Sequence, residues 1–316
     1  MALAIVTIGG SVGLMLLSPL CALLTERYSW RGSMLLMGAL SLNQLPLALL
    51  MRPYPHGNRN NPKTQHAVKP TLKDLFDVKL ACRPLFIVVV VLCLVFFGGV
   101  IVYVSMLPLL AVQQGLNKVD GASLLAVTGL SGMAGRVTSA VLAAFTKLAG
   151  SLVMAIGHFF CGTALLLLYT CDSFHSFAFV CTLFGFSQGV TLGYSAPFLL
   201  ELFGQQHKFH RVFGMTSFFI GFTLLGVPQL AGRIAAYSLI LTFMVAGTLN
   251  VLAALCYAIM AAVIRSHRAA VQLEVDDRKN TNGQQEQQLK EECIELNTLK
   301  RDLGDTVDVE NVSNTL

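Results

Sequence analysis

The chain has 316 residues, of which 54% are hydrophobic and 12% charged, and its mean hydropathy is +0.66. A water-soluble globule of this length cannot hide so large an apolar fraction, so the composition excludes an ordinary soluble domain and favours a protein embedded in a lipid bilayer. The formal net charge of +5 does not indicate a nucleic-acid partner, because the basic residues lie between apolar runs rather than along one polar face.

Eight apolar segments are long enough to cross the hydrocarbon core of a bilayer, which takes about 20 residues of helix. They cover residues 2–24, 32–51, 84–111, 122–145, 150–170, 174–203, 212–233 and 237–264. These segments are continuously apolar and lack the period-two alternation of barrel strands. The sequence therefore predicts an all-α membrane protein with about eight transmembrane helices.

The longest connection between these helices, residues 52–83, is strongly basic. It carries Arg52, Arg59, Lys63, Lys69, Lys73, Lys79 and Arg83, whereas the neighbouring connections hold only Arg27, Arg31 and Lys118. Because Lys and Arg accumulate on the cytoplasmic side of membrane proteins, this loop is predicted to be cytoplasmic. An even number of spans then places both termini in the cytoplasm. The loop separates a two-helix segment, residues 1–51, from a six-helix bundle, residues 84–264.

One charged side chain, Arg136, lies deep inside a predicted span. Burying an arginine in hydrocarbon costs about 2.5–3.5 kcal/mol on insertion scales, so the side chain is expected to face a cavity or a partner. Gly129, Gly132, Ser139 and Ala140 lie three, four or seven residues away, on the same side of the helix. We expect Arg136 to bind a substrate carboxylate through its planar fork of donors. The alternative is an arginine that donates to carbonyl groups of neighbouring helices.

Other polar residues of the spans have two interpretations each. The pKa of a histidine such as His158 suits proton transfer, although a lone membrane histidine is usually a hydrogen-bonded core residue. Gln188 either lines a polar path or forms hydrogen bonds between helices. Phe184, Phe186, Tyr194 and Phe198 either shape an aromatic pocket or pack as ordinary core.

The sequence offers no catalytic, metal or cofactor motif. The eight cysteines form no C-x-x-C pair and have no histidine at metal-ligand spacing. Zinc-protease, nucleophile-elbow and phosphate-loop motifs are absent as well, so an enzyme is not expected and no metal or cofactor site is predicted.

The last segment, residues 265–316, differs from the rest of the chain in composition. It holds seven Lys or Arg against eleven Asp or Glu and is rich in Gln and Asn. We expect an acidic, disordered cytoplasmic tail with at most a short helix around residues 284–301.

Eight stretches of the sequence form a recognisable series: residues 9–20, 26–32, 35–53, 113–136, 185–189, 201–204, 213–214 and 226–232. Together, and in this order, they resemble the monocarboxylate transporter family of the major facilitator superfamily. They correspond to the fifth to twelfth helices of the family, with Glu26 to Gly32 resembling the turn after the fifth. The resemblance implies a partial major facilitator fold, with two helices from the first half and six from the second, that lacks the first four helices.

The resemblance also implies a function. It predicts a secondary transporter that moves small monocarboxylates or related organic anions across the plasma membrane by alternating access. Arg136 matches the family's carboxylate-binding arginine, and the aspartate that takes up the proton in proton-coupled members is replaced by Gly132. We therefore expect transport without the usual proton relay. A single-span chaperone subunit is a further candidate partner, and the alternative function is a non-transporting protein that regulates or scaffolds a full-length relative.

Overall fold

The computed structural model describes residues 2–50, 82–145, 149–203 and 206–304. Side chains are described over the same ranges except at residues 2–7, 118, 206–208, 210, 268, 271 and 274–304. The described residues are almost entirely helical and contain no strand, which confirms the predicted all-α class. The helices are α1 (Ala2–Leu42), α2 (Gln44–Leu50), α5 (Pro84–Gln113), α6 (Lys118–Phe145), α7 (Gly150–Leu167), η2 (Leu168–Thr170), α8 (Phe174–Phe203), α9 (Gln206–Tyr237) and α10 (Leu239–Gly304).

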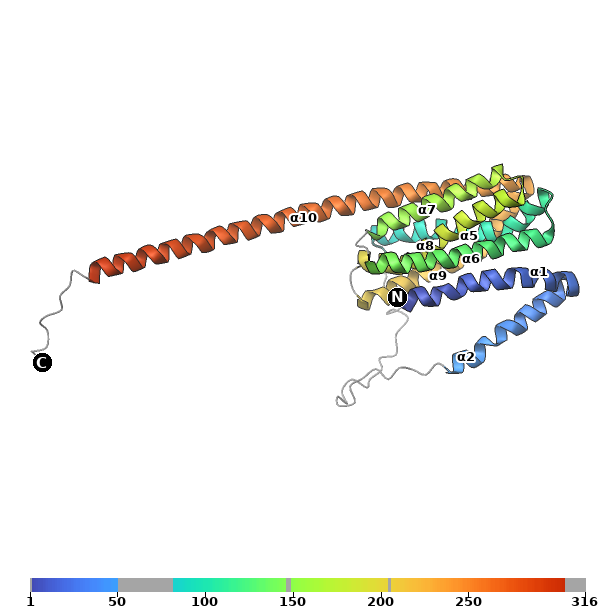
Figure 1. Ribbon diagram of the computed structural model, residues 1–316, viewed down its shortest axis with the longest axis horizontal. Coiled ribbons are helices and arrows are strands. Elements are labelled where there is room, and N and C mark those ends of the chain that lie inside the picture. Colours follow the sequence, from blue (N-terminus) through green and yellow to red (C-terminus); the bar gives the residue numbers. More distant parts are fainter. Residues whose placement is uncertain (1, 51–81, 146–148, 204–205, 305–316) are drawn as a thin grey trace, which may run out of the picture. The chain divides into compact units, whose positions relative to one another are not determined.

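The first helix contains two helical segments that meet at Ser29. A straight helix of its 41 residues would be about 62 Å long, twice the thickness of the hydrocarbon core. Ser29 instead has φ 58° and ψ 175°, a conformation rare for residues with a side chain, and the chain reverses there towards α2 (Figure 1). Seven stretches of the described chain are long and apolar enough to cross a membrane, with Ile8–Leu50 counted as one across this break. The break lies between the predicted spans at 2–24 and 32–51.

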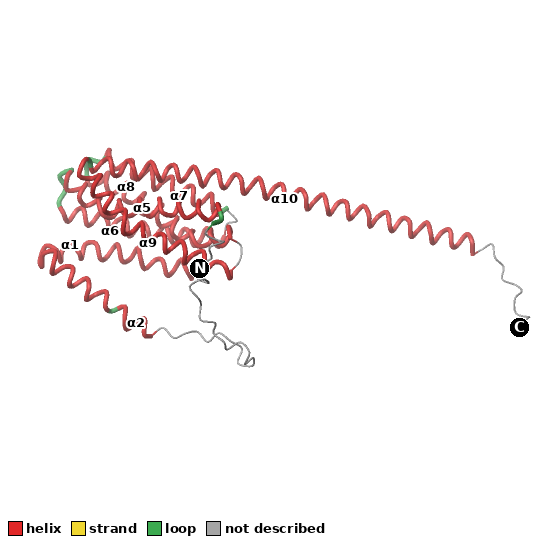
Figure 2. Tube along the Cα trace, turned by 180° about the vertical axis from the view of Figure 1, so that it is seen from behind, coloured by secondary structure: helices red, strands yellow, loops and turns green. Residues whose placement is uncertain are grey.

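Helix α6 lies at the centre of the packing that positions the candidate site. It contacts α1, α5 and α8, and α8 in turn packs against α7 (Figure 2). Helix α5, which contacts α6, also packs against α9. The chain thus brings α1 and α8, which are far apart in sequence, onto two faces of one helix.

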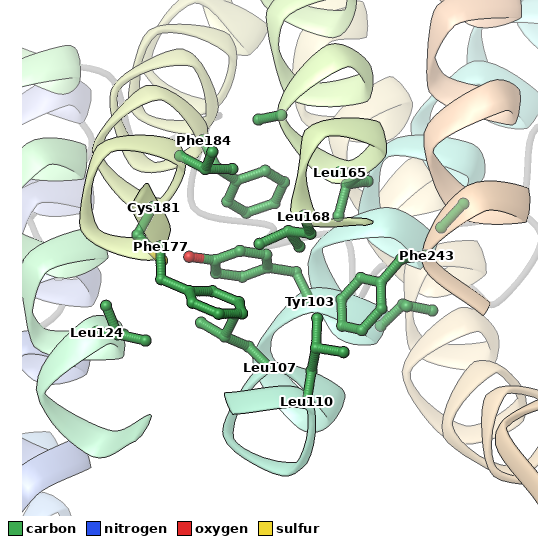
Figure 3. Packing of buried hydrophobic residues seen from close by; sticks show 14 of the residues in the cluster. Tyr103, Leu107, Leu110, Leu124, Leu165, Leu168, Phe177, Cys181, Phe184 and Phe243 are labelled. Carbon is green, nitrogen blue, oxygen red and sulfur yellow. The ribbon is translucent and has the colours of Figure 1, made fainter. Parts of the chain in front are cut away.

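A buried cluster around Tyr103 joins α5, α6 and α8 with α7, η2 and the beginning of α10 (Figure 3). The Tyr103 ring stacks on Phe184 with centroids 3.9 Å apart, and its hydroxyl lies 2.6 Å from Oγ1 of Thr128. Tyr194 belongs to a second buried cluster, and Phe186 is 40% exposed. These aromatic side chains do not meet in one pocket, so their arrangement supports the interpretation as ordinary core packing.

Apolar side chains cover the exposed surface of the helices as well as filling the core. Leu35, Phe179 and Leu225 are at least 70% exposed on three different helices. Monomeric soluble proteins rarely present so much exposed apolar surface. A lipid environment accounts for it.

The chain divides into two compact units, Met1–Ala261 and Ala262–Leu316. The division falls close to the predicted start of the tail at residue 265. In the second unit α10 continues as a helix to Gly304, where the sequence analysis expected disorder with at most a short helix around 284–301. Glu, Gln, Lys and Leu dominate this stretch, and these unbranched residues lose little side-chain freedom in a helix. Most of the basic loop at 52–83 lies outside the described residues.

Candidate substrate-binding site

Arg136 lies in the interior of α6 and is only 8% exposed. Its Nη1 donates a hydrogen bond to Oγ of Ser11 on α1. Its Nε is buried and has no hydrogen-bond partner among the described residues. No carboxylate of the described chain forms an ion pair with it. The guanidinium therefore retains unused donor capacity and an uncompensated charge.

Two glycines of α6 allow α1 to approach the arginine. A Cβ atom at Gly129 would lie 2.6 Å from the backbone nitrogen of Met15 and 2.8 Å from the carbonyl oxygen of Ser11. A Cβ at Gly132 would lie 3.1 Å from Oγ of Ser11. The contact at Gly129 is too close for a residue with a side chain unless α1 moves away, and a Cβ at Gly132 would require the Ser11 side chain to shift by a few tenths of an ångström. The absence of side chains at these positions brings Ser11 within reach of Arg136.

Glycines also set the contact between α6 and α8. Gly185, Gly189 and Gly193 recur every fourth residue on α8, and a Cβ on any of them would collide with α6. Small residues at this spacing are typical of close helix pairs in membranes. The contact fixes the rotation of α6, and thereby the side on which Arg136 emerges.

Ser139 takes part in this second contact. It is fully buried, its hydroxyl donates to the carbonyl of Arg136 (2.7 Å), and a Cβ at Gly193 would collide with it. Gly132, by contrast, lies between Ser11 of α1 and the carbonyl of Gly185 on α8. Of the four residues predicted on the same side of the helix as Arg136, the structure places Gly129 and Gly132 against Ser11, the hydrogen-bond partner of Arg136, and Ser139 in the interface between α6 and α8.

His158 is fully buried on α7, in surroundings that do not include Arg136. Its Nδ1 lies 2.8 Å from the carbonyl oxygen of Met154, and its ring packs against Phe96 (5.1 Å between centroids) and Tyr257 (4.7 Å). Because a carbonyl only accepts hydrogen bonds, Nδ1 carries the proton and Nε2 is left as an acceptor. Nε2 has no partner in the part of the chain that is described. These contacts are those of a packed core residue.

Gln188 lies on α8 and is partly exposed. Its side chain forms no hydrogen bond to another described residue. The structure thus brings Arg136 and Gly132 together and places His158 and Gln188 apart from them.

A cavity of about 850 Å³ lies between α1, α5 and α6. Its lining residues are Gly10, Gly13, Leu14, Leu17, Ser18, Cys21, Ala22, Thr25, Glu26, Val104, Pro108, Val119, Ala122 and Leu125. Gly10 connects the cavity to the arginine, because a Cβ at this position would lie 3.5 Å from both Nη1 and Nη2 of Arg136. Gly10 thus belongs both to the lining of the cavity and to the surroundings of the guanidinium, whereas Arg136 is not among the lining residues.

Sequence reasoning did not identify Ser11 or Gly10 as site residues. Both belong to the small-residue run at residues 9–13. That run supported the resemblance to the fifth helix of the family. It did not indicate which helix would be the neighbour, because Ser11 and Arg136 are 125 positions apart.

The described residues include no group of three or more His, Cys, Asp or Glu side chains that could hold a metal ion. The chemistry available at the site is that of a buried cation beside an apolar cavity. Such an arrangement is suited to holding an anionic group by charge and hydrogen bonds rather than to making or breaking bonds.

Comparison with known proteins gives a consistent family assignment. The profile of the Major Facilitator Superfamily matches residues 1–222. Monocarboxylate transporter 4 of Rattus norvegicus is 26% identical over 236 residues, which cover 74% of this chain and 50% of the relative. Monocarboxylate transporter 3 of the same species is 26% identical over 255 residues, covering 79% of this chain and 52% of the relative.

A third relative matches a shorter stretch. Monocarboxylate transporter 12 of Mus musculus is 24% identical over 155 residues, covering 41% of this chain and 32% of the relative. The chain spans about half the length of the curated relatives that it matches best. These matches confirm the resemblance drawn from the sequence motifs. Together with the helical bundle and its seven stretches of membrane-spanning length, they establish that this multi-pass membrane protein belongs to the Major Facilitator Superfamily.

Proposed function

We propose that the chain belongs to a secondary transporter that carries small monocarboxylates or related organic anions across the plasma membrane by alternating access. The observation that carries the proposal is Arg136, a buried guanidinium with an unused donor and no carboxylate partner among the described residues. Its closeness to Gly10, which lines a cavity of about 850 Å³, supports a role in binding.

The energetics of Arg136 favour an anionic ligand. A buried charge is costly unless it is paired and hydrogen-bonded, and one hydroxyl acceptor from Ser11 compensates it only in part. A carboxylate supplies both the opposite charge and two acceptor oxygens at the spacing of the guanidinium donors. Substrate binding would therefore relieve an interaction deficit that exists in the unliganded protein.

We also propose that transport does not use an aspartate proton relay on α6. The position four residues before Arg136 is Gly132, whose missing Cβ would lie 3.1 Å from Ser11 Oγ and 3.3 Å from the carbonyl oxygen of Gly185. A side chain at this position would require Ser11 or the backbone of Gly185 to shift, so the packing disfavours a carboxylate here. Uptake by facilitated diffusion, without stimulation by acid, follows from this arrangement.

The proposed topology follows the distribution of charge. The basic loop at residues 52–83 would lie in the cytoplasm, together with both termini. A small organic anion and the lipid bilayer are the proposed partners, and a single-span chaperone subunit is a further candidate. A transporter of this kind carries its solute without chemical change, so enzymatic activity is not part of the proposal.

The experiment that tests the function is uptake of radiolabelled lactate and pyruvate by cells expressing the chain, with surface abundance measured by biotinylation. Arg136→Ala and Arg136→Lys should each lower uptake at least tenfold, because neither side chain can bind a carboxylate bidentately. Thr138→Ala, which removes a hydroxyl bonded only to its own helix, is the matched control on α6. Undiminished uptake by both arginine variants at normal abundance would refute the proposal.

A second candidate function is regulation or scaffolding of a full-length relative by a non-transporting chain. One observation favours it: the segment after Ser29 is largely exposed, with Leu35 73% and Leu49 85% exposed. Absence of uptake by the wild-type chain, combined with its co-purification with a full-length monocarboxylate transporter, would favour this function over transport.

A further inference from the structure

A groove of about 340 Å³ lies between α5, α9 and α10 and shares no lining residue with the cavity beside Gly10. All of its lining residues belong to the membrane-length stretches Pro84–Gln113, Arg211–Tyr237 and Leu239–His267. The groove is therefore within the bilayer. Its lining residues are Val91, Leu94, Val95, Gly98, Gly99, Val102, Thr223, Val227, Leu230, Ala231, Ile234, Thr242, Val245, Ala246 and Leu249.

The groove is open towards the lipid. Val91, Leu230 and Leu249 line it and are 51%, 61% and 46% exposed, one on each of the three helices. No charged or amide side chain is among the lining residues, and two threonines are the only side chains with a polar group. Ordered water needs two to four polar partners at one place, so the occupant is a component of the bilayer rather than water or a soluble solute.

Rigidity and hydrogen bonding decide which bilayer component such a groove prefers. Lipid tails are as apolar as the walls, so the hydrophobic effect gives no component an advantage. Close contact, hydrogen bonds and the entropy that a ligand retains remain as the selective terms. An acyl chain loses rotational freedom when a groove orders it, whereas a fused ring system has little to lose. A rigid, flat ligand is therefore favoured.

The walls suit a flat ring system. Gly98 has no side chain, and a Cβ at this position would lie 3.7 Å from Cγ2 of Val227 and 4.0 Å from Cγ2 of Thr223. Valine and isoleucine make up much of the rest of the lining, and their χ1 angles are stiff. From Val91 to Val102 the groove follows α5 for about 16 Å, close to the half-thickness of the hydrocarbon core, about 15 Å. A ligand that spans one leaflet matches this length.

One hydrogen-bond acceptor lies at the end of the groove where α10 begins. Thr242 is in the first turn of α10 and 3% exposed, and its hydroxyl donates to the carbonyl oxygen of Ser238 at 3.3 Å. The lone pairs of that hydroxyl remain able to accept a bond from a ligand. Tyr237, 91% exposed, precedes this turn, and tyrosine is typical of the membrane interface, the level at which a sterol hydroxyl lies. Arg233, Tyr237 and Leu239 also follow, in reverse order, the weak aliphatic–aromatic–basic pattern proposed for cholesterol contact.

We propose that the groove between α5, α9 and α10 binds a membrane sterol, with the ring system over Gly98 and the sterol hydroxyl donating to Thr242. The site is distinct from the surroundings of Arg136 and does not depend on the proposed transport of anions. An acyl chain of a phospholipid and a second copy of the chain are the competing occupants, and the test separates them from a sterol.

The test is photolabelling of the purified full chain in phosphatidylcholine nanodiscs with a diazirine-bearing cholesterol analogue, followed by mass spectrometry of the labelled peptides. Saturable labelling is expected within residues 91–102, 223–234 and 242–249. Cholesterol should compete with the label. Epicholesterol, whose hydroxyl is inverted, and cholestene, which has no hydroxyl, should compete about fivefold more weakly because each loses the one hydrogen bond. Methyl oleate, an acyl chain without a charged group, should not compete.

Variants test the two parts of the site. Thr242→Val should make cholesterol and cholestene compete equally, whereas Thr248→Val, which removes a hydroxyl bonded to Met244 on the same helix and outside the groove, should keep the preference for cholesterol. Gly98→Leu should lower saturable labelling about fivefold or more by filling the groove. Gly221→Leu, at a position on α9 with no atom within 4 Å and outside the lining, is its control. Size-exclusion profiles and thermal unfolding establish that each variant is folded, and the competition series on the wild-type chain decides if Gly98→Leu is not.

Each contrary result identifies what is wrong. Labelling that does not saturate, or that spreads evenly over the lipid-facing helices, would overturn the site. Equal competition by methyl oleate and cholesterol would show that acyl chains occupy the groove. An unchanged preference for cholesterol in Thr242→Val would overturn the role of that hydroxyl. A disulfide-linked dimer of Leu249→Cys that the wild-type chain does not form, together with absent sterol labelling, would assign the groove to a second copy.

Discussion

Ser11 on α1 accepts a hydrogen bond from Nη1 of Arg136 on α6, across 125 positions of sequence. This bond joins a helix that precedes the basic loop to a helix that follows it. It is also the only hydrogen bond that the described residues give the guanidinium. The contact therefore connects the two parts of the chain through the residue that we propose binds substrate.

Removing the Ser11 hydroxyl should leave the buried guanidinium without an acceptor. Ser11→Ala is expected to lower the free energy of unfolding by about 1–3 kcal/mol, the usual cost of a buried charged donor left unsatisfied. The measurement is equilibrium unfolding in mixed micelles. Ser41→Ala, which removes an exposed hydroxyl bonded to its own helix at Met37, is the control and should change stability by less than about 0.5 kcal/mol. Equal effects of the two variants would contradict the assigned role.

The contact between α1 and α6 should be sensitive to a single methyl group. In Gly129→Ala the new Cβ would lie 2.6 Å from the backbone nitrogen of Met15, which cannot move without shifting α1. Overpacking of this kind costs about 1–3 kcal/mol. Thermal unfolding of the purified chain measures it. Gly38→Ala, at a position with no atom within 4 Å, should be neutral or slightly stabilising, and a Gly129→Ala variant as stable as Gly38→Ala would show that the helices do not pack as described.

An aspartate introduced at position 132 should not create proton coupling. Gly132→Asp would force a carboxylate between Ser11 of α1 and the carbonyl of Gly185 on α8, and separation of the helices is the expected result. Uptake is predicted to fall without gaining acid stimulation, when assayed between pH 6 and pH 8. Gly132→Ala separates the steric effect from the charge. Acid-stimulated uptake by Gly132→Asp at normal abundance would show that the position has room for a proton carrier.

The hydrogen bond between Tyr103 and Thr128 should contribute measurably to the core. Tyr103→Phe keeps the stacking on Phe184 and removes a hydroxyl 2.6 Å from Thr128 Oγ1, so a loss of about 0.5–1.5 kcal/mol is expected. A double-mutant cycle with Thr128→Val isolates the pair, and a coupling energy near zero would contradict the bond. Tyr169→Phe, at a residue 59% exposed, is the neutral control.

The spans could be located from the sequence because the rule behind them is local. In a bilayer every backbone polar group must be paired within its own segment, so a run of about 20 apolar residues predicts a helix without knowledge of its neighbours. The segments at 84–111, 150–170 and 174–203 correspond closely to α5, α7 with η2, and α8. For residues after 265 only a short helix around 284–301 was predicted, and the continuous helix to Gly304 was not, because low apolar content favours disorder whereas the residue types themselves favour helix.

The sequence by itself determined that the protein is a bundle of membrane-length helices and that Arg136 is its one deeply buried charge in a span. Both conclusions follow from the cost of placing polar groups in hydrocarbon, which depends only on residue type and position along a helix. The tertiary structure decided which neighbours these residues meet: Arg136 meets Ser11 and Gly10, Ser139 faces α8, and His158 lies among Phe96 and Tyr257. The rotation and pairing of the helices depend on close contact between surfaces that are far apart in sequence. Hydrophobic periodicity does not indicate which of these surfaces will meet.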